Sequence, residues 1–208
     1  AVEVSTIDLG RDVRKLKQIS LDTGLTIVAS TGFYLTQYHP EWLASASAAA
    51  IAEVYVRELT EGIDDTGIKA GIIAEIASSP ERFEGEEKKI LKGCGASRPR
   101  QTGAAVSTHT GRATAVETIE TLLAEGMDPD KIIIGHQDLI DDTKYHVQLL
   151  KYGVTSRLIP AAKKPICRMK RGPAMRWRSW KPAMAIICFS ATISPAGLIL
   201  QARAAMVI

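Results

Sequence analysis

The chain has 208 residues, of which 46% are hydrophobic and 24% are charged, so it is neither a disordered nor a collagen-like protein and is long enough for one ordinary domain. Three cysteines are too few for a disulfide scaffold, and residues 1–10 show no signal-peptide pattern. These features predict a reduced, cytoplasmic protein.

The charges divide the sequence near residue 153. All 23 acidic residues and all four histidines lie in residues 1–153, which carry 16 Lys and Arg residues and so a net charge of −7. Residues 154–208 carry ten Lys and Arg residues and no Asp or Glu, a net charge of +10. Because a compact domain of even surface composition rarely divides its charges in this way, we expect one domain at 1–153 and a separate basic tail at 154–208.

Residues 1–153 alternate short β-branched runs with longer helical patterns. The apolar runs predict strands at 2–7, 25–30, 70–76, 104–109 and 131–136. The helical patterns predict helices at 11–23, 40–61, 81–92, 114–125 and 141–150. This alternation indicates an α/β fold of parallel βαβ units, which is either an open doubly wound sheet or part of a (β/α)8 barrel.

Three polar residues stand at or near the carboxyl ends of successive predicted strands: Glu75, His109 and His136. Sites in parallel α/β proteins are built at these strand ends. A carboxylate on an apolar strand is costly to bury unless it is paired or bound to a metal, and imidazoles with a carboxylate suit Zn²⁺. Each residue alone is also compatible with a structural role, but three successive strands with this feature predict a divalent metal site.

The other histidines and the acids near the last helix favour structural roles. His39 lies in a loop after an aromatic cluster, and His146 lies within a predicted helix, where we expect it at the surface. Asp141 and Asp142 open that helix, where acidic residues interact favourably with the helix dipole.

Four segments together resemble the phosphotriesterase family, and more specifically its phosphotriesterase homology and phosphotriesterase-related proteins in the amidohydrolase superfamily. The segments are STGFY at 30–34, GIDDTGIKAGIIAEI at 62–76, STHTGR at 107–112 and IIIGHQDLIDD at 132–142. The resemblance covers most of residues 1–153. It implies a (β/α)8 TIM barrel of the metal-dependent hydrolase type.

The resemblance also implies the roles of the three strand-end residues. His109 is the ligand from strand five, His136 is the ligand from strand six, and Glu75 takes the bridging position on strand four of a binuclear zinc site. Such a site cleaves small ester, lactone, amide or phosphoester bonds through a metal-bound hydroxide.

The family's His-x-His pair on strand one and its aspartate on strand eight have no counterpart here. We therefore expect an incomplete barrel, with strands 2–6 intact, strand 1 missing and strands 7–8 scrambled. We also expect at most partial zinc occupancy and an impaired activity.

The tail has the features of a frameshifted translation after about residue 153. Residues 165–170 (PICRMK) can be encoded so that a shifted frame gives Tyr-Met-Pro-Asp-Glu. Residues 188–195 (CFSATISP) can give Leu-Phe-Ser-Asp-Asp-Ile-Ser in the same frame. Both restored strings resemble family text, and the absence of acids in the tail agrees with this interpretation.

Three functions stay open on the sequence alone. The first is the zinc-dependent hydrolase, and the second is a non-catalytic degenerate or mistranslated relative that binds at most one metal. The third is nucleic-acid or membrane binding through the basic tail, which includes the uncharged stretch 182–202. We expect a small-molecule substrate rather than nucleic acid or a membrane, and the oligomeric state stays open, with a homodimer as one option.

Overall fold

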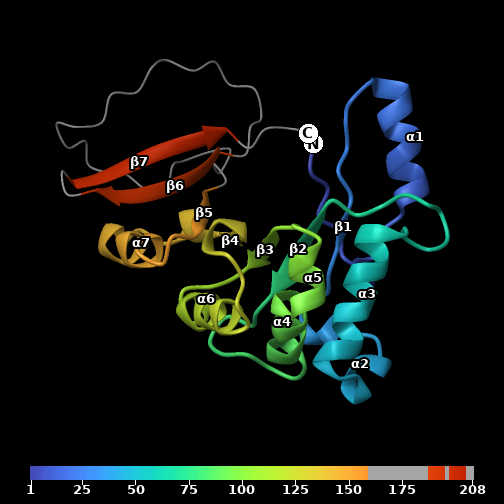
Figure 1. Ribbon diagram of the computed structural model, residues 1–208, viewed down its shortest axis with the longest axis horizontal. Helices are drawn as coiled ribbons and strands as arrows, with labels where there is room; N and C mark the ends of the chain where they lie inside the picture. Colours follow the sequence, from blue (N-terminus) through green and yellow to red (C-terminus); the bar gives the residue numbers. More distant parts are fainter. Residues whose placement is uncertain (159–186, 195–196, 205–208) are drawn as a thin grey trace.

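The computed structural model describes residues 1–158, 187–194 and 197–204. Its described strands form one sheet, whose spatial order follows the chain from β1 to β7 (Figure 1). The strands are β1 (Ser30–Thr31), β2 (Ile72–Ala77), β3 (Val106–His109), β4 (Ile132–Ile134), β5 (Thr155–Leu158), β6 (Ile187–Ser194) and β7 (Gly197–Ala204). Strands β1 to β5 pair in parallel, whereas β5, β6 and β7 pair antiparallel.

Helices connect the parallel strands. They are α1 (Val13–Thr23), α2 (Trp42–Ser45), α3 (Ala48–Thr60), α4 (Glu87–Gly95), α5 (Ser97–Gln101), α6 (Ala115–Ala124) and α7 (Thr143–Leu150). In Figure 1 the helices α3, α4, α6 and α7 follow one another along one side of the sheet, and the β6–β7 hairpin lies at the end far from α1. Each βα connection therefore returns the chain to the same layer, as parallel strands require.

The main core lies between the sheet and these helices. It consists of apolar side chains such as Ile73 and Ile134 from the strands and Ile51, Ile90 and Ile119 from the helices, all of them buried. The strands expected at 70–76, 104–109 and 131–136 fall on β2, β3 and β4, so the predicted alternation is confirmed there, whereas the strand expected at 25–30 overlaps β1 only at Ser30.

The strand expected at residues 2–7 is wrong in form. The segment lies beside β1, with Glu3 N donating to Val28 O at 2.9 Å and Ile7 N donating to Gly32 O at 3.0 Å, but only Val2 and Val28 form a β-bridge. The Ser5 amide donates to Glu3 Oε1 at 3.0 Å. Because the Glu3 carboxylate accepts the hydrogen bond of the Ser5 amide, that amide is not available for pairing with β1, and the β-ladder is interrupted.

The helix expected at 40–61 is divided into α2 and α3. Ser47 has an extended backbone, and its hydroxyl accepts a hydrogen bond from Ala50 N at 3.1 Å. This is the N-cap arrangement that begins a new helix. The alanine-rich sequence pattern therefore does not reveal that one helix ends and another begins at Ser47.

The parallel sheet extends past residue 153. Strand β5 pairs in parallel with β4 through Ile133–Thr155 and Ile134–Ser156. Of the two strings used for the frameshift interpretation, 165–170 lies outside the described residues, and residues 188–194 of the other belong to β6, which does not test the reading frame. Within the part of the chain that is described, no helix has the length and hydropathy that a membrane crossing needs.

Candidate metal centre

Strands β2, β3 and β4 position the three predicted ligands. Glu75 lies on β2, His109 ends β3, and His136 follows β4 by two residues. The three strands are parallel neighbours, with Ala77 opposite His109 and Thr108 opposite Ile134. Their carboxyl ends therefore meet at one edge of the sheet, where the side chains converge.

The ligand atoms of this cluster lie close together. Glu75 Oε2 is 3.2 Å from His109 Nδ1 and 3.5 Å from His136 Nε2. All three ligand atoms lie within 4.8 Å of one another, and the carboxylate is buried while the imidazoles are partly exposed. One carboxylate oxygen and two ring nitrogens form a set of donors that suits Zn²⁺, so the residues fit a divalent ion.

The backbone at His136 is unusual. Its φ is +57°, in the left-handed region that non-glycine residues adopt only at a cost of order 1 kcal/mol. Gly135 N is held by Thr108 O at 3.1 Å just before it, and Leu139 N donates to His136 O at 3.3 Å just after it. The chain thus leaves β4 in a sharp turn that keeps the imidazole beside Glu75.

Tyr34 completes the surroundings of His109. Its hydroxyl lies 3.2 Å from His109 Nε2, on the side of the ring opposite Glu75. Burial raises the pKa of Tyr34, and the negative charge of Glu75 raises it further, so the phenol stays protonated. The sequence pattern gave Tyr34 no role, although Tyr34 lies just after β1, near the carboxyl end of the strand next to β2.

Gly32 allows Tyr34 to reach the cluster. A Cβ atom at this position would lie 2.2 Å from Ala74 O, on the backbone of β2. Any side chain would therefore push the end of β1 away from the strand that carries Glu75.

A buried hydrogen-bond network joins the loops behind the histidines. Gln137 Nε2 donates to Thr110 O at 2.9 Å, and Tyr145 OH donates to Gln137 Oε1 at 2.9 Å. It links the loop after β3, the loop after β4 and helix α7. These residues were missed by sequence reasoning, because a Gln beside a His is uninformative until the fold brings its partners together.

A pocket of about 260 Å³ opens beside the two histidines. Its described lining includes His109 and His136, the polar residues Thr110 and Arg112, and the apolar residues Leu139 and Ile140. The pocket is large enough for a small organic molecule next to the cluster.

The structure places the remaining sequence candidates outside the cluster. His146 is buried, contrary to the expected surface position, because Ile140 O lies 2.7 Å from its Nε2. His39 Nε2 lies 3.0 Å from Tyr34 O. Asp142 caps α7, as expected, by accepting from Tyr145 N at 3.1 Å. The side-chain hydrogen bond from Arg112 lowers the pKa of Asp142.

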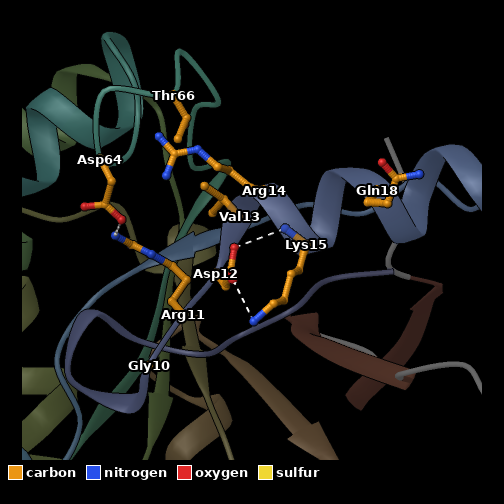
Figure 2. A pocket seen from close by; sticks show the side chains of 9 residues that line it. All are labelled: Gly10, Arg11, Asp12, Val13, Arg14, Lys15, Gln18, Asp64 and Thr66. Atoms are coloured by element: carbon orange, nitrogen blue, oxygen red, sulfur yellow. Dashed lines mark hydrogen bonds and ion pairs between the residues drawn. The ribbon is translucent and has the colours of Figure 1, made fainter.

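A larger pocket, of about 640 Å³, lies at the start of α1 and contains none of the three ligands (Figure 2). Figure 2 shows Asp12 bonded to Lys15 and Arg11 directed toward Asp64. Four of the five charged side chains in its described lining form ion pairs, Asp12 with Lys15 and Arg11 with Asp64, and this lining lacks imidazoles. The smaller pocket is therefore the better candidate for chemistry.

Comparisons with known proteins agree with this geometry. The sequence model of the Phosphotriesterase family matches residues 1–157. The phosphotriesterase homology protein of Escherichia coli K12 is 33% identical over 153 residues, which are 73% of this chain and 52% of that protein. The N-acetyltaurine hydrolase of Xenopus tropicalis is 35% identical over 147 residues, which are 69% of this chain and 42% of that protein.

A solved structure shows the same likeness. The crystal structure of the Escherichia coli phosphotriesterase homology protein, complexed with phosphate in its active site, superposes with a TM-score of 0.74 and 31% identity. The match covers 78% of this chain and 56% of that one. The parallel α/β sheet is thus of the TIM-barrel hydrolase type, and the chain spans about half the length of the curated relatives it matches. The chain belongs to the phosphotriesterase family.

Proposed function

We propose that this chain carries a zinc-dependent hydrolase centre in which Glu75, His109 and His136 hold the ion. The observation that carries the proposal is the convergence of three ligand atoms within 4.8 Å at the carboxyl edge of a parallel sheet. A buried carboxylate that faces two imidazoles at this edge is suited to bind a cation and is poorly suited to bind an apolar ligand.

The ion and the residues around it would have separate roles in the proposed reaction. A zinc ion held there would supply Lewis-acid chemistry, which lowers the pKa of bound water and polarises the bond to be cleaved. Tyr34 orients the His109 ring through Nε2, so that Nδ1 faces Glu75. Leu139 and Ile140 give one side of the pocket an apolar surface.

The proposed substrates are small molecules with an ester, lactone, amide or phosphoester bond. A pocket of about 260 Å³ accepts a compound of that size. The names of two relatives support this range: one is a hydrolase of N-acetyltaurine, and the structure of another holds phosphate in its active site.

The ligand set supports one ion rather than two. Among the described residues, the three ligands form a single cluster of this kind. A second candidate function is a non-catalytic relative that holds one metal, since three protein ligands are enough to bind a single ion. The cytoplasmic location, the oligomeric state and the hydrolytic activity of the chain remain predictions.

Metal titration of the full chain tests the proposal. We expect about one Zn²⁺ per chain, and replacement by Co²⁺ should give the visible absorption of a metal bound by imidazole and carboxylate. His109→Ala and His136→Ala should each abolish this spectrum. His39→Ala is the matched control, since His39 bonds a backbone carbonyl instead.

Hydrolysis by the zinc-loaded chain then separates the two candidates. Release of nitrophenol from a nitrophenyl ester or phosphoester, lost in His109→Ala, supports the hydrolase. Metal binding without turnover supports the non-catalytic relative. If both histidine variants bind zinc as well as the unchanged chain, the proposed centre is wrong.

A further inference from the structure

Arg112 gives the pocket beside the metal centre a positive side. Among the described residues that line this pocket, it is the one residue of the types Lys, Arg, Asp and Glu. It lies three residues after His109, in the loop from β3 to α6. Its charge therefore stands next to the residues that would hold the ion.

The guanidinium is already oriented. Arg112 Nη2 donates to Asp142 Oδ2 at 2.7 Å, and its Cζ lies 4.7 Å from the centre of the Tyr145 ring. The side chain nevertheless remains 55% exposed. An arginine has five N–H donors, so the single bond to Asp142 leaves others for a second anion.

A further feature favours an anion at this place. Thr110 lines the pocket and is 1% exposed, and its hydroxyl has no hydrogen-bond partner within the described part of the chain. Because a buried hydroxyl without a partner is costly, a ligand that accepts a hydrogen bond from it is favoured.

We propose that this pocket binds the anionic group of a small acid, a carboxylate, sulfonate or phosphate, with Arg112 as its charge partner and Thr110 as a further donor. The inference deepens the proposed function: the bond to be cleaved would lie at the Glu75–His109–His136 cluster, and the anionic group would lie on the Arg112 side. The apolar residues Leu139 and Ile140 would contact the carbon skeleton of the substrate.

Binding of simple anions to the full chain tests this inference. Inorganic phosphate, acetate and methanesulfonate are titrated by calorimetry or NMR, once with the metal-free chain and once with the zinc-loaded chain. We expect Arg112→Gln to weaken the preferred anion about tenfold, the loss expected for one charge-assisted hydrogen bond. Arg112→Lys should recover part of this loss, and Thr110→Val should weaken binding to a smaller extent.

The Asp142→Asn variant separates a binding role from a structural one. An asparagine still caps α7, because its side-chain oxygen also accepts from Tyr145 N, but it removes the charge that competes for Arg112. Anion affinity should therefore rise severalfold, opposite to the effect of Arg112→Gln. Arg14→Gln, at the other pocket, should leave binding unchanged.

The outcomes are distinct. Equal anion affinity in Arg112→Gln and the unchanged chain overturns the inference, and so does weaker binding in Asp142→Asn, which would show that the pair matters as a structural unit. Preference among the three anions identifies the acid. Because the titration with the metal-free chain does not need zinc, it stands even if the metal titration contradicts the proposed function.

Discussion

The Glu58 carboxylate accepts two hydrogen bonds from the Arg11 guanidinium, from Nη1 at 2.7 Å and from Nη2 at 2.9 Å. The side chains are only 5% and 2% exposed, respectively. Arg11 Nη1 also donates to Ser30 O at 2.9 Å, so the pair fastens the start of α1 and helix α3 to β1. We expect Arg11→Met to destabilise the fold by about 3–5 kcal/mol, because it leaves a buried carboxylate without its partner.

Urea unfolding followed by circular dichroism measures this loss. The double variant Arg11→Met/Glu58→Leu should recover much of the stability, since it removes both buried charges. Lys15→Ala is a surface control: Lys15 and Asp12 also form an ion pair, but their side chains are 82% and 41% exposed. If Arg11→Met costs no more than Lys15→Ala, the buried pair does not stabilise the fold as described.

Tyr34→Phe should weaken metal binding while leaving the fold intact. The hydroxyl of Tyr34 is the partner of His109 Nε2, and it fixes the ring with Nδ1 toward Glu75. Loss of such a partner behind a metal ligand typically costs 10–100-fold in affinity, so we expect about a tenfold rise in the zinc dissociation constant.

Competition with a chelator of known affinity gives that constant. Tyr38→Phe is the matched control, because the Tyr38 ring lies 5.8 Å from the Tyr34 ring but the residue is exposed and outside the cluster. Equal affinities in the two variants would mean that the Tyr34 hydroxyl does not position His109.

Glu87 stabilises two loops at the same edge of the sheet. Its buried carboxylate accepts hydrogen bonds from Ser79 N at 2.9 Å, Ser79 Oγ at 2.7 Å, Glu84 N at 2.9 Å and Thr36 Oγ1 at 3.2 Å. Glu87→Ala leaves these donors unsatisfied, so we expect a loss of about 3 kcal/mol or more in unfolding free energy.

The neighbouring residue provides the control for Glu87. Glu86 forms an ion pair with Lys89 near the surface, and such pairs contribute about 1 kcal/mol or less. Chemical denaturation of Glu86→Ala and Glu87→Ala should therefore give clearly different midpoints. Similar midpoints would contradict the assigned role of the buried carboxylate.

The sequence predicted that Glu75, His109 and His136 lie together, because this prediction needs only the order of the strands along the chain. Parallel strands in chain order place their carboxyl ends side by side, so a polar residue at the end of each of three strands predicts a shared site. Glu75, His109 and His136 met this condition, and the structure brings them together. Tyr34 and Gln137 did not stand out, since their partners are set by the packing of loops from different βα units.

The errors in the fold have local causes of the same kind. The pattern at residues 2–7 suits a strand, but Glu3 takes the Ser5 amide. The pattern at 40–61 suits one helix, but Ser47 caps a second one. His146 suits a helix surface, but the carbonyl of Ile140 lies within hydrogen-bond reach of its ring. In each case one hydrogen bond, invisible to periodicity, decides the local structure.

Cys94 should be unreactive in the folded chain. It is completely buried on α4, and burial raises the pKa of its thiol to about 12. The thiolate, which is the reactive form, is therefore absent near pH 8. In a background with Cys167→Ser and Cys188→Ser, we expect Ellman's reagent to modify Cys94 only at the rate of unfolding, and at once in concentrated guanidinium chloride.

The same thiol makes stability fall at alkaline pH. An unfolded thiol loses its proton near pH 8.5, whereas the folded one keeps it up to about pH 12, so the folded state binds more protons between these values. The stabilisation is complete below the unfolded pKa and decreases as the pH rises through this window. Burial raises the pKa of Tyr55 as well, which acts in the same direction at higher pH. Unfolding free energies measured from pH 8 to 11 should decline less steeply in Cys94→Ala than in the unchanged chain, and equal slopes would show that the thiol titrates alike in both states.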